Sequence, residues 1–486
     1  MSYYKLILGG WFLSLALSVG ALGLHAQDEP QNPDDDKTKP KPAGTTYPIP
    51  TVDAGSQDQN NTPDTTNGLQ PDTTPLTGIQ DATLGSPETR HSYWVPGFQY
   101  GGTIQSNGFG QANNSGWFMN NYLVGNISLL KAWSRSELAV NYSGGAFFST
   151  DSALGNGTYQ RLALAQNFEW NRWAMQILEH FSYLPQSQFG FGGGTNLGVP
   201  GVGSIGPTIP GLGLGYVPNQ SIYAAFGPQY SNVTALQVTY ATSRRGSITA
   251  SGSYGTLNFV DPGNVDNSST SGTVGYNYEL TRQNSIGGFY RFSGYHFAGQ
   301  PQAFGSNSFN LAFSRKLTGR MALQAYGGPE ITTFRIPVDG QSSKIGANLG
   351  VTLDYAFKDG GLAGRYFHGV TGGSGVFTGS TVDQVNLTAN RRLSRVWTGH
   401  LNFGYAHNKS IVSSTTASSA GYNSWFLGGG VTRPFGRNAT IAIAYNADIS
   451  SYAPSGCTGN SCSSNQTTSS SIIVNFQWHT RPMVLP

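Results

Sequence analysis

The stretch Thr-Val-Gly-Tyr-Asn-Tyr-Glu-Leu at residues 273–280 decides the fold class. Every second residue is apolar, from Val274 to Leu280, and the residues between are small, amide or acidic. This period of two predicts a β-strand with one apolar and one polar face. Each such run is about ten residues, long enough for a tilted strand to cross a bilayer. The same alternation recurs at residues 138–143, 309–314, 397–405 and 439–446.

The composition excludes several classes of protein. The chain has 486 residues, of which 66 are glycine, 12% are aromatic and only 10% are charged. Soluble domains carry roughly 25% charged residues, so a soluble helical or α/β enzyme does not fit. A wholly disordered chain would not contain so many aromatic residues. The net charge of +3 is too small to suggest nucleic-acid binding.

The first part of the chain differs from the rest. Residues 1–26 read as a signal peptide, with Lys5 before an apolar run from Leu6 to Leu24. Residues 27–92 hold eleven acidic residues, four basic residues and ten prolines, which predicts a disordered linker. No later segment approaches the roughly 20 apolar residues of a membrane-spanning helix. If the mature protein spans a membrane, it does so with strands.

Short basic turns recur between the strands. They lie near residues 134, 171, 244, 283, 318, 359, 393 and 435. Most are spaced by about 38 residues, the length of two strands, a short turn and a longer loop. Eight turns join sixteen strands, and further strands near 96–105 and 470–478 make eighteen. The doubled spacing before residue 244 leaves room for another hairpin. We therefore predict an all-β, transmembrane, antiparallel up-and-down β-barrel of about 18 strands (16–20).

The strand–turn unit Asn277–Gln283 and the aromatic-ended strand Ile472–Trp478 resemble porin-like outer-membrane β-barrel proteins of Gram-negative bacteria, a group of uncharacterised cargo. The resemblance implies a barrel over residues 93–478 and a C-terminal tail over 479–486. It implies the outer membrane as location, with short turns and the linker in the periplasm. The implied partners are outer-membrane lipid, lipopolysaccharide and the barrel-assembly machinery, and the barrel is either a monomer or a homotrimer.

In each predicted strand the polar side chains occupy every second position, and this alternation predicts which side chains face the lumen. The pore-lining candidates are Arg161, Asn167, Glu169, Asn277, Glu279, Arg291, Asp354, Arg365, His400, Asn402 and Asn446. The same parity adds Glu137, Asn141, Asn348, Asn390 and Asn475. Amides dominate and both charge signs occur, so we expect weak ion selectivity at most. Alternatively, opposite charges, for example Arg161 and a carboxylate, pair and fill the lumen.

The candidate constriction is Leu184–Gln229, which has twelve glycines, six prolines and no charged residue. A loop this long is usually functional or disordered. It folds into the lumen, covers the outer surface, or contributes an extra strand near Gly211–Gly215.

Other chemistry is sparse. Cys457 and Cys462, the two cysteines of an exported chain, are expected to form a disulfide. We expect no metal site and no cofactor, and the dispersed histidines do not suggest an enzyme. The preferred function is passive, weakly selective diffusion of small hydrophilic solutes. The alternatives are a closed structural or adhesive barrel, or an export duct for a polymer.

Overall fold

The computed structural model describes residues 92–106, 116–150, 156–184, 228–260, 264–281, 283–338, 340–373, 375, 377–412, 419–436, 438–454, 465–481 and 483–485. The predicted signal peptide and all but the last residue of the predicted linker lie outside these ranges. So do the cysteine pair and nearly all of the predicted constriction at 184–229. These remain predictions.

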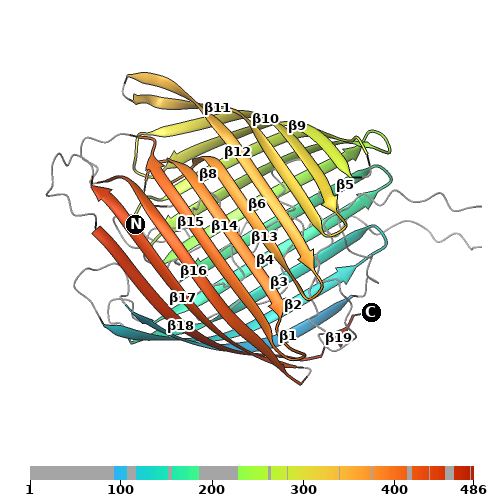
Figure 1. The fold of residues 1–486 in the computed structure, drawn as a ribbon, viewed down its shortest axis with the longest axis vertical. Coiled ribbons are helices and arrows are strands. Elements are labelled where there is room, and N and C mark those ends of the chain that lie inside the picture. The colour runs from blue at the N-terminus through green and yellow to red at the C-terminus, as the bar shows by residue number, and fades with distance from the viewer. Residues whose placement is uncertain are drawn as a thin grey trace, which may run out of the picture. The chain divides into compact units, whose positions relative to one another are not determined.

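Eighteen long strands and one short strand account for most of the described chain (Figure 1). Their bounds are β1 Tyr93–Ser106, β2 Trp117–Ala132, β3 Ser136–Ser149, β4 Gly157–Trp170, β5 Trp173–Leu184, β6 Gln229–Ala241, β7 Gly246–Phe259, β8 Asn267–Glu279, β9 Asn284–Phe297, β10 Ala303–Thr318, β11 Met321–Val338, β12 Gln341–Phe357, β13 Gly360–Thr371, β14 Ser380–Arg392, β15 Thr398–Ser410, β16 Ser419–Phe435, β17 Ala439–Pro454, β18 Asn465–His479 and β19 Met483–Val484. No described segment forms a helix with the length and apolar character needed to cross a membrane.

The strands form one closed antiparallel sheet. From β1 to β18, each strand pairs with the next in the chain. β18 then returns to β1, with a register running from Gly97 opposite His479 to Ser106 opposite Ser470. Beyond β18 the chain continues beside β1, where Met483 lies opposite Trp94. The predicted up-and-down barrel of about eighteen strands is confirmed.

All eight predicted short turns connect consecutive strands, beginning with β2–β3 and ending with β16–β17. They lie together at one end of the barrel, which we call the short-turn end; the opposite end is the long-connection end. The turns are local structures: the Ser243 hydroxyl, for example, accepts from the backbone amide of Gly246 at 2.9 Å. At the long-connection end β11 and β12 extend beyond their neighbours (Figure 1).

The wall also requires small residues where strands approach closely. A Cβ added to Gly328 on β11 would lie 1.7 Å from the carbonyl oxygen of Phe309 on β10. By contrast, a Cβ added to Gly346 on β12 would meet nothing nearer than 4.0 Å. Gly328 is therefore needed for close packing of β10 and β11.

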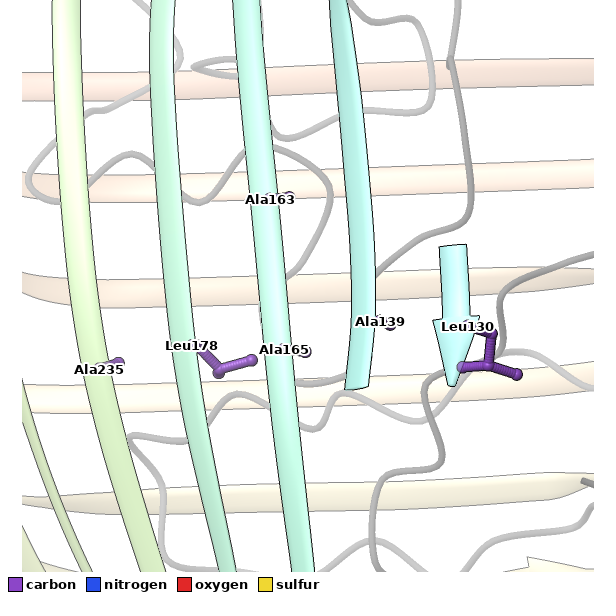
Figure 2. Packing of buried hydrophobic residues seen from close by; sticks show 6 residues of the cluster. All are labelled: Leu130, Ala139, Ala163, Ala165, Leu178 and Ala235. Carbon is purple, nitrogen blue, oxygen red and sulfur yellow. The ribbon is translucent and has the colours of Figure 1, made fainter. Parts of the chain in front are cut away.

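One sector of the inner face carries an apolar stripe. The stripe runs across β2–β6 in direct register, so that each residue lies opposite the next. It consists of Leu130, Ala139, Ala165, Leu178 and Ala235, with Ala163 beside it on β4 (Figure 2). Most members are alanines, so the inner face is lined by short side chains in this sector.

Candidate functional site

The two faces of the barrel wall differ in chemistry. On β10, Leu311 leaves 74% of its surface exposed, whereas its neighbour Asn310 leaves 3%. Side chains outside a closed barrel meet no other part of the wall. The alternate strand positions with exposed side chains therefore form the outer face. That face carries large apolar side chains, such as Leu401 and Phe309. The inner face carries mostly polar ones, so the barrel has the two faces of a membrane-spanning channel.

Aromatic side chains mark the short-turn end of the outer face. Six aromatic residues lie at or near that end: Trp133, Trp170, Trp173, Tyr278, Trp397 and Trp478. Five of them are at least 37% exposed, and Trp397 is covered in part by the guanidinium group of Arg433, 5.5 Å from its ring. Amphipathic rings prefer the membrane–water interface, so this band indicates one edge of the apolar belt.

The pore-lining candidates that can be placed share the inner parity of their strands. They are Arg161, Asn167, Asn277, Glu279, Arg291, Asp354, Arg365, His400, Asn402 and Asn446. The asparagines among them are at most 6% exposed. The side chain of Glu169 falls outside the described side chains. That these residues line a path for solutes stays a prediction.

The placed candidates do not converge on one cluster. The Arg161 Nε donates to His180 Nε2 at 3.2 Å, so this arginine contacts an imidazole. His400 lies against the wall, because a Cβ added to Gly430 would sit 2.7 Å from its Cε1. The candidates are instead distributed around the inner face, from β4 to β17.

The connection between β13 and β14 enters the barrel. We call its described residues, 372, 373, 375 and 377–379, the inner loop. Phe377 is 7% exposed and stacks on Tyr422 of β16, with ring centroids 5.5 Å apart and planes at 24°. The carbonyl oxygen of Gly375 accepts from the backbone amide of Val265, just before β8, at 2.9 Å. Two loop residues thus contact parts of the wall that are eight strands apart.

Glycine makes this loop conformation accessible. Gly373, Gly375 and Gly379 have φ angles of 81°, 80° and 94°, which other residues rarely adopt. The backbone amide of Phe377 also donates to the carbonyl oxygen of Gly373 at 3.1 Å. At its base the β13–β14 hairpin is closed by a hydrogen bond between the hydroxyls of Thr371 and Ser380.

The end of β13 is held against the neighbouring wall. The backbone amide of Val370 donates to the carboxylate of Glu330 on β11. Its carbonyl oxygen accepts from the Tyr295 hydroxyl of β9 at 3.3 Å. The Ser306 hydroxyl of β10 donates to Glu330 at 2.5 Å. Side chains from three strands therefore direct the chain inward where the inner loop begins.

The inner loop limits the width of the barrel at this level. The contacts through Gly375 and Phe377 place the Cα atoms of Val265 and Tyr422 no more than about 27 Å apart. In a circular barrel of this size, positions eight strands apart would be separated by about 35 Å. The wall, or the chain leading into β8, comes inward here, and the loop crosses the remaining space.

Many polar atoms on the inner face are buried without a protein hydrogen-bond partner. Among the described residues they include side-chain atoms of Thr103, Asn126, Asn141, Gln176, Asn267, Thr273, Asn277, Asn310, Gln324, Asn348, Asn386, Asn402, Asn408 and Asn446. A buried polar group left without any partner costs about 1–3 kcal/mol. Ordered water is the usual partner of such atoms in a polar interior. The inner face is therefore strongly polar.

The constriction predicted from sequence and the one found in the structure differ. Leu184–Gln229 lies almost wholly outside the described residues, and the inner loop at 372–379 was not predicted. Its sequence has a readable signal: two apolar residues, Val376 and Phe377, within a run of glycine, serine and threonine between two strands. An apolar side chain in such a loop suggests that the loop packs against something.

No protein-family model and no curated protein matches the sequence. Among solved structures, Pseudomonas aeruginosa OccK5 (OpdH) matches at 10% identity with a TM-score of 0.40, over 80% of this chain and 98% of that chain. OpdQ from the same organism matches at 9% identity and 0.41, over 81% and 100%. OccK2 (OpdF), solved in complex with glucuronate, matches at 9% and 0.42, over 79% and 98%. The barrel fold is established by the strand pairing described under the overall fold.

Proposed function

We propose that this protein is a channel of the Gram-negative outer membrane through which small hydrophilic solutes diffuse passively. The observation that carries the proposal is the pairing of an apolar, exposed outer face with an inner face rich in polar side chains. A barrel of eighteen strands is wide enough to hold an aqueous path. Diffusion through such a path needs no cofactor and no chemical step.

The orientation follows from the turns. Outer-membrane barrels keep short turns on the periplasmic side and longer loops outside. The short-turn end carries many exposed basic side chains, including Arg135, Arg172, Arg244 and Arg391. These suit the anionic phospholipid headgroups of the inner leaflet. In this orientation the N-terminal linker enters from the periplasm, and the inner loop lies toward the extracellular mouth.

Weak ion selectivity is part of the proposal. Charged rings of one sign produce strong selectivity in pores. Here the inner face presents arginines such as Arg161 and Arg291 together with carboxylates such as Glu330 and Asp448. Neither sign dominates, so cations and anions should pass at comparable rates.

A closed structural barrel is the second candidate, and the inner loop favours it. If the loop and its neighbours block the path fully, the barrel conducts nothing and acts through its surface. Conductance of the refolded mature protein in a planar bilayer separates the two functions. Stable steps with a small reversal potential in a salt gradient support the channel. A correctly folded, heat-modifiable barrel without conductance contradicts it.

A further inference from the structure

One acidic side chain lies on the outer face of the barrel wall. Glu179 of β5 shares the outward parity of Phe181, which is 36% exposed, whereas His180 between them is buried on the inner face. The Asn232 side-chain amide and the Thr234 hydroxyl, both of β6, donate to its two carboxylate oxygens at 2.5 Å each. An ionisable group is thus fixed on the face that otherwise carries apolar side chains.

Aromatic residues frame this acid along its strand. Trp173 of β5 lies opposite Tyr240 of β6, with ring centroids 4.5 Å apart. Ten residues further along β5, Tyr183 lies opposite Tyr230. A strand tilted by about 45° needs about 9–11 residues to cross the hydrocarbon core. Glu179 comes six residues after Trp173, so it lies about 14 Å from the aromatic band of the short-turn end, inside the apolar belt.

Two glycines lie on the same face and at the same level. Gly252 of β7 lies opposite the exposed Leu236 of β6, and Gly272 of β8 lies opposite Gly252. Like the acid, they are six and seven residues from the short-turn ends of their strands. A Cβ added to either would meet nothing nearer than 3.8 Å, so the wall itself does not require glycine there. By contrast, a Cβ added to Gly144 of β3 would lie 2.3 Å from the hydroxyl of Tyr142.

The outer face of β5–β8 therefore differs from the rest of the outer wall. On β16–β18 that face carries exposed apolar residues such as Leu427, Ile443 and Val474. Glycine inside a strand weakens it and often marks a place where another backbone approaches closely. An ionisable group in the hydrocarbon core is costly and usually contacts protein. Small residues together with hydrogen-bonding groups are characteristic of protein–protein contacts within membranes.

A second copy of this chain fits this face. A two-fold axis along the membrane normal, passing between β6 and β7, brings β5–β6 of one copy against β7–β8 of the other at equal height. Glu179 then faces Gly252 and Gly272, and the Tyr254 phenol beside them, 51% exposed, supplies a hydrogen-bond donor. Four tilted strands cover about 27 Å of wall and the belt is about 25 Å tall. Two such faces can bury up to about 1,300 Å² in total, the size of a stable interface.

We propose that the outer face of β5–β8 is the contact surface of a two-fold symmetric dimer of this protein. In the dimer, the Glu179 carboxylate accepts a hydrogen bond from Tyr254 of the partner subunit. Gly252 and Gly272 let the two walls approach closely at the level of the acid. The proposal requires the barrel to lie in a membrane and makes no use of its conductance.

Photo-cross-linking in lipid vesicles tests the proposal. Barrels carrying two different tags are refolded together, each with p-benzoylphenylalanine in place of Leu236, which lies near the axis on β6. Irradiation should give a product of two barrels that carries both tags. The same photoreactive residue in place of Leu311, 74% exposed on the outer face of β10, is the matched control and should give almost none.

Substitutions test the individual residues. Gly272→Leu adds bulk toward the partner and should raise the dissociation constant of the dimer by at least about tenfold, measured by energy transfer between labelled barrels in vesicles. Glu179→Leu removes the acceptor and should also raise it. Gly125→Leu is the matched control on β2, because a Cβ added to Gly125 meets nothing nearer than 3.9 Å. It should leave the dissociation constant unchanged.

Four outcomes would overturn the proposal: no product with both tags at any protein-to-lipid ratio, equal cross-linking from the Leu311 position, a product of three barrels, or a dissociation constant that Gly272→Leu leaves unchanged in heat-modifiable barrels. The first would mean that Glu179 faces lipid. Dimers that do not conduct would reject the proposed channel and retain the interface. Single barrels that conduct would do the reverse.

Discussion

Removal of the inner loop should enlarge the channel. Because Thr371 and Ser380 lie opposite each other at the base of the hairpin, residues 372–379 can be replaced by Asn-Gly, a two-residue turn that suits antiparallel strands. The barrel wall would keep all its strand pairs. The contacts of Gly375 with Val265, of Phe377 with Tyr422 and of Gly379 with Ile411 would disappear.

The size of the effect follows from the geometry. A circular barrel of eighteen strands has a lumen about 24 Å wide once side chains are included. A chain with its side chains is about 10 Å thick, so a loop across the lumen covers roughly half of the cross-section. Conductance scales with the open area at the narrowest level. We therefore expect about a twofold increase in single-channel conductance, with the reversal potential nearly unchanged.

Single-channel recording in 1 M salt is the assay, with heat-modifiable electrophoretic mobility as the test of folding. The matched control replaces the β9–β10 connection, Ala298–Gln302, by the same Asn-Gly turn at the same end of the barrel. It should leave the conductance unchanged. Unchanged conductance in the folded inner-loop variant would refute the reasoning, because the loop would then not lie in the path of the ions.

Three further predictions concern the wall and the anchor of the loop. Leu311→Arg, at an outer position 74% exposed, should destabilise the barrel in lipid vesicles by about 2–4 kcal/mol in denaturant titration, whereas Ser314→Arg on the inner face should not. Gly328→Ala should cost about 1–3 kcal/mol by the same titration, and Gly346→Ala should be neutral. Glu330→Gln weakens the hold on the end of β13, so channel recordings should show more frequent current fluctuations at the same mean conductance; an equally quiet channel would contradict the anchor.

The strands and short turns were predictable because their signals are local. Alternation within ten residues assigns a strand and its two faces, and Asn277 and Asn402 accordingly lie on the inner parity. Turn residues act within four positions of one another. These short-range rules are enough to count the strands of an up-and-down barrel, in which every neighbour in the chain is also a neighbour in space.

The inner loop and the packing of aromatic rings on the inner face were not predictable in this way. Gly375 meets Val265 from 110 residues away, and no periodicity reports such a contact. Tyr326 covers Gly350 only because the register of β11 and β12 sets them opposite each other. The alternation of polar and apolar residues also says nothing about aromatic residues, such as Phe289, that lie on the inner face. Features that depend on register or on contacts across the lumen require the assembled barrel.

The seam between β1 and β18 has a consequence for biogenesis. Gln99 donates to Asn475 at 2.7 Å across 376 positions of the chain, and no shorter segment can supply this contact. Loop closure over such a separation is slow. Until it occurs, the two edge strands, β1 and β18, offer unpaired backbone groups to other chains. The cylinder is thus complete only when β18 reaches β1. A chain shortened by even one strand would remain an open sheet with two adhesive edges.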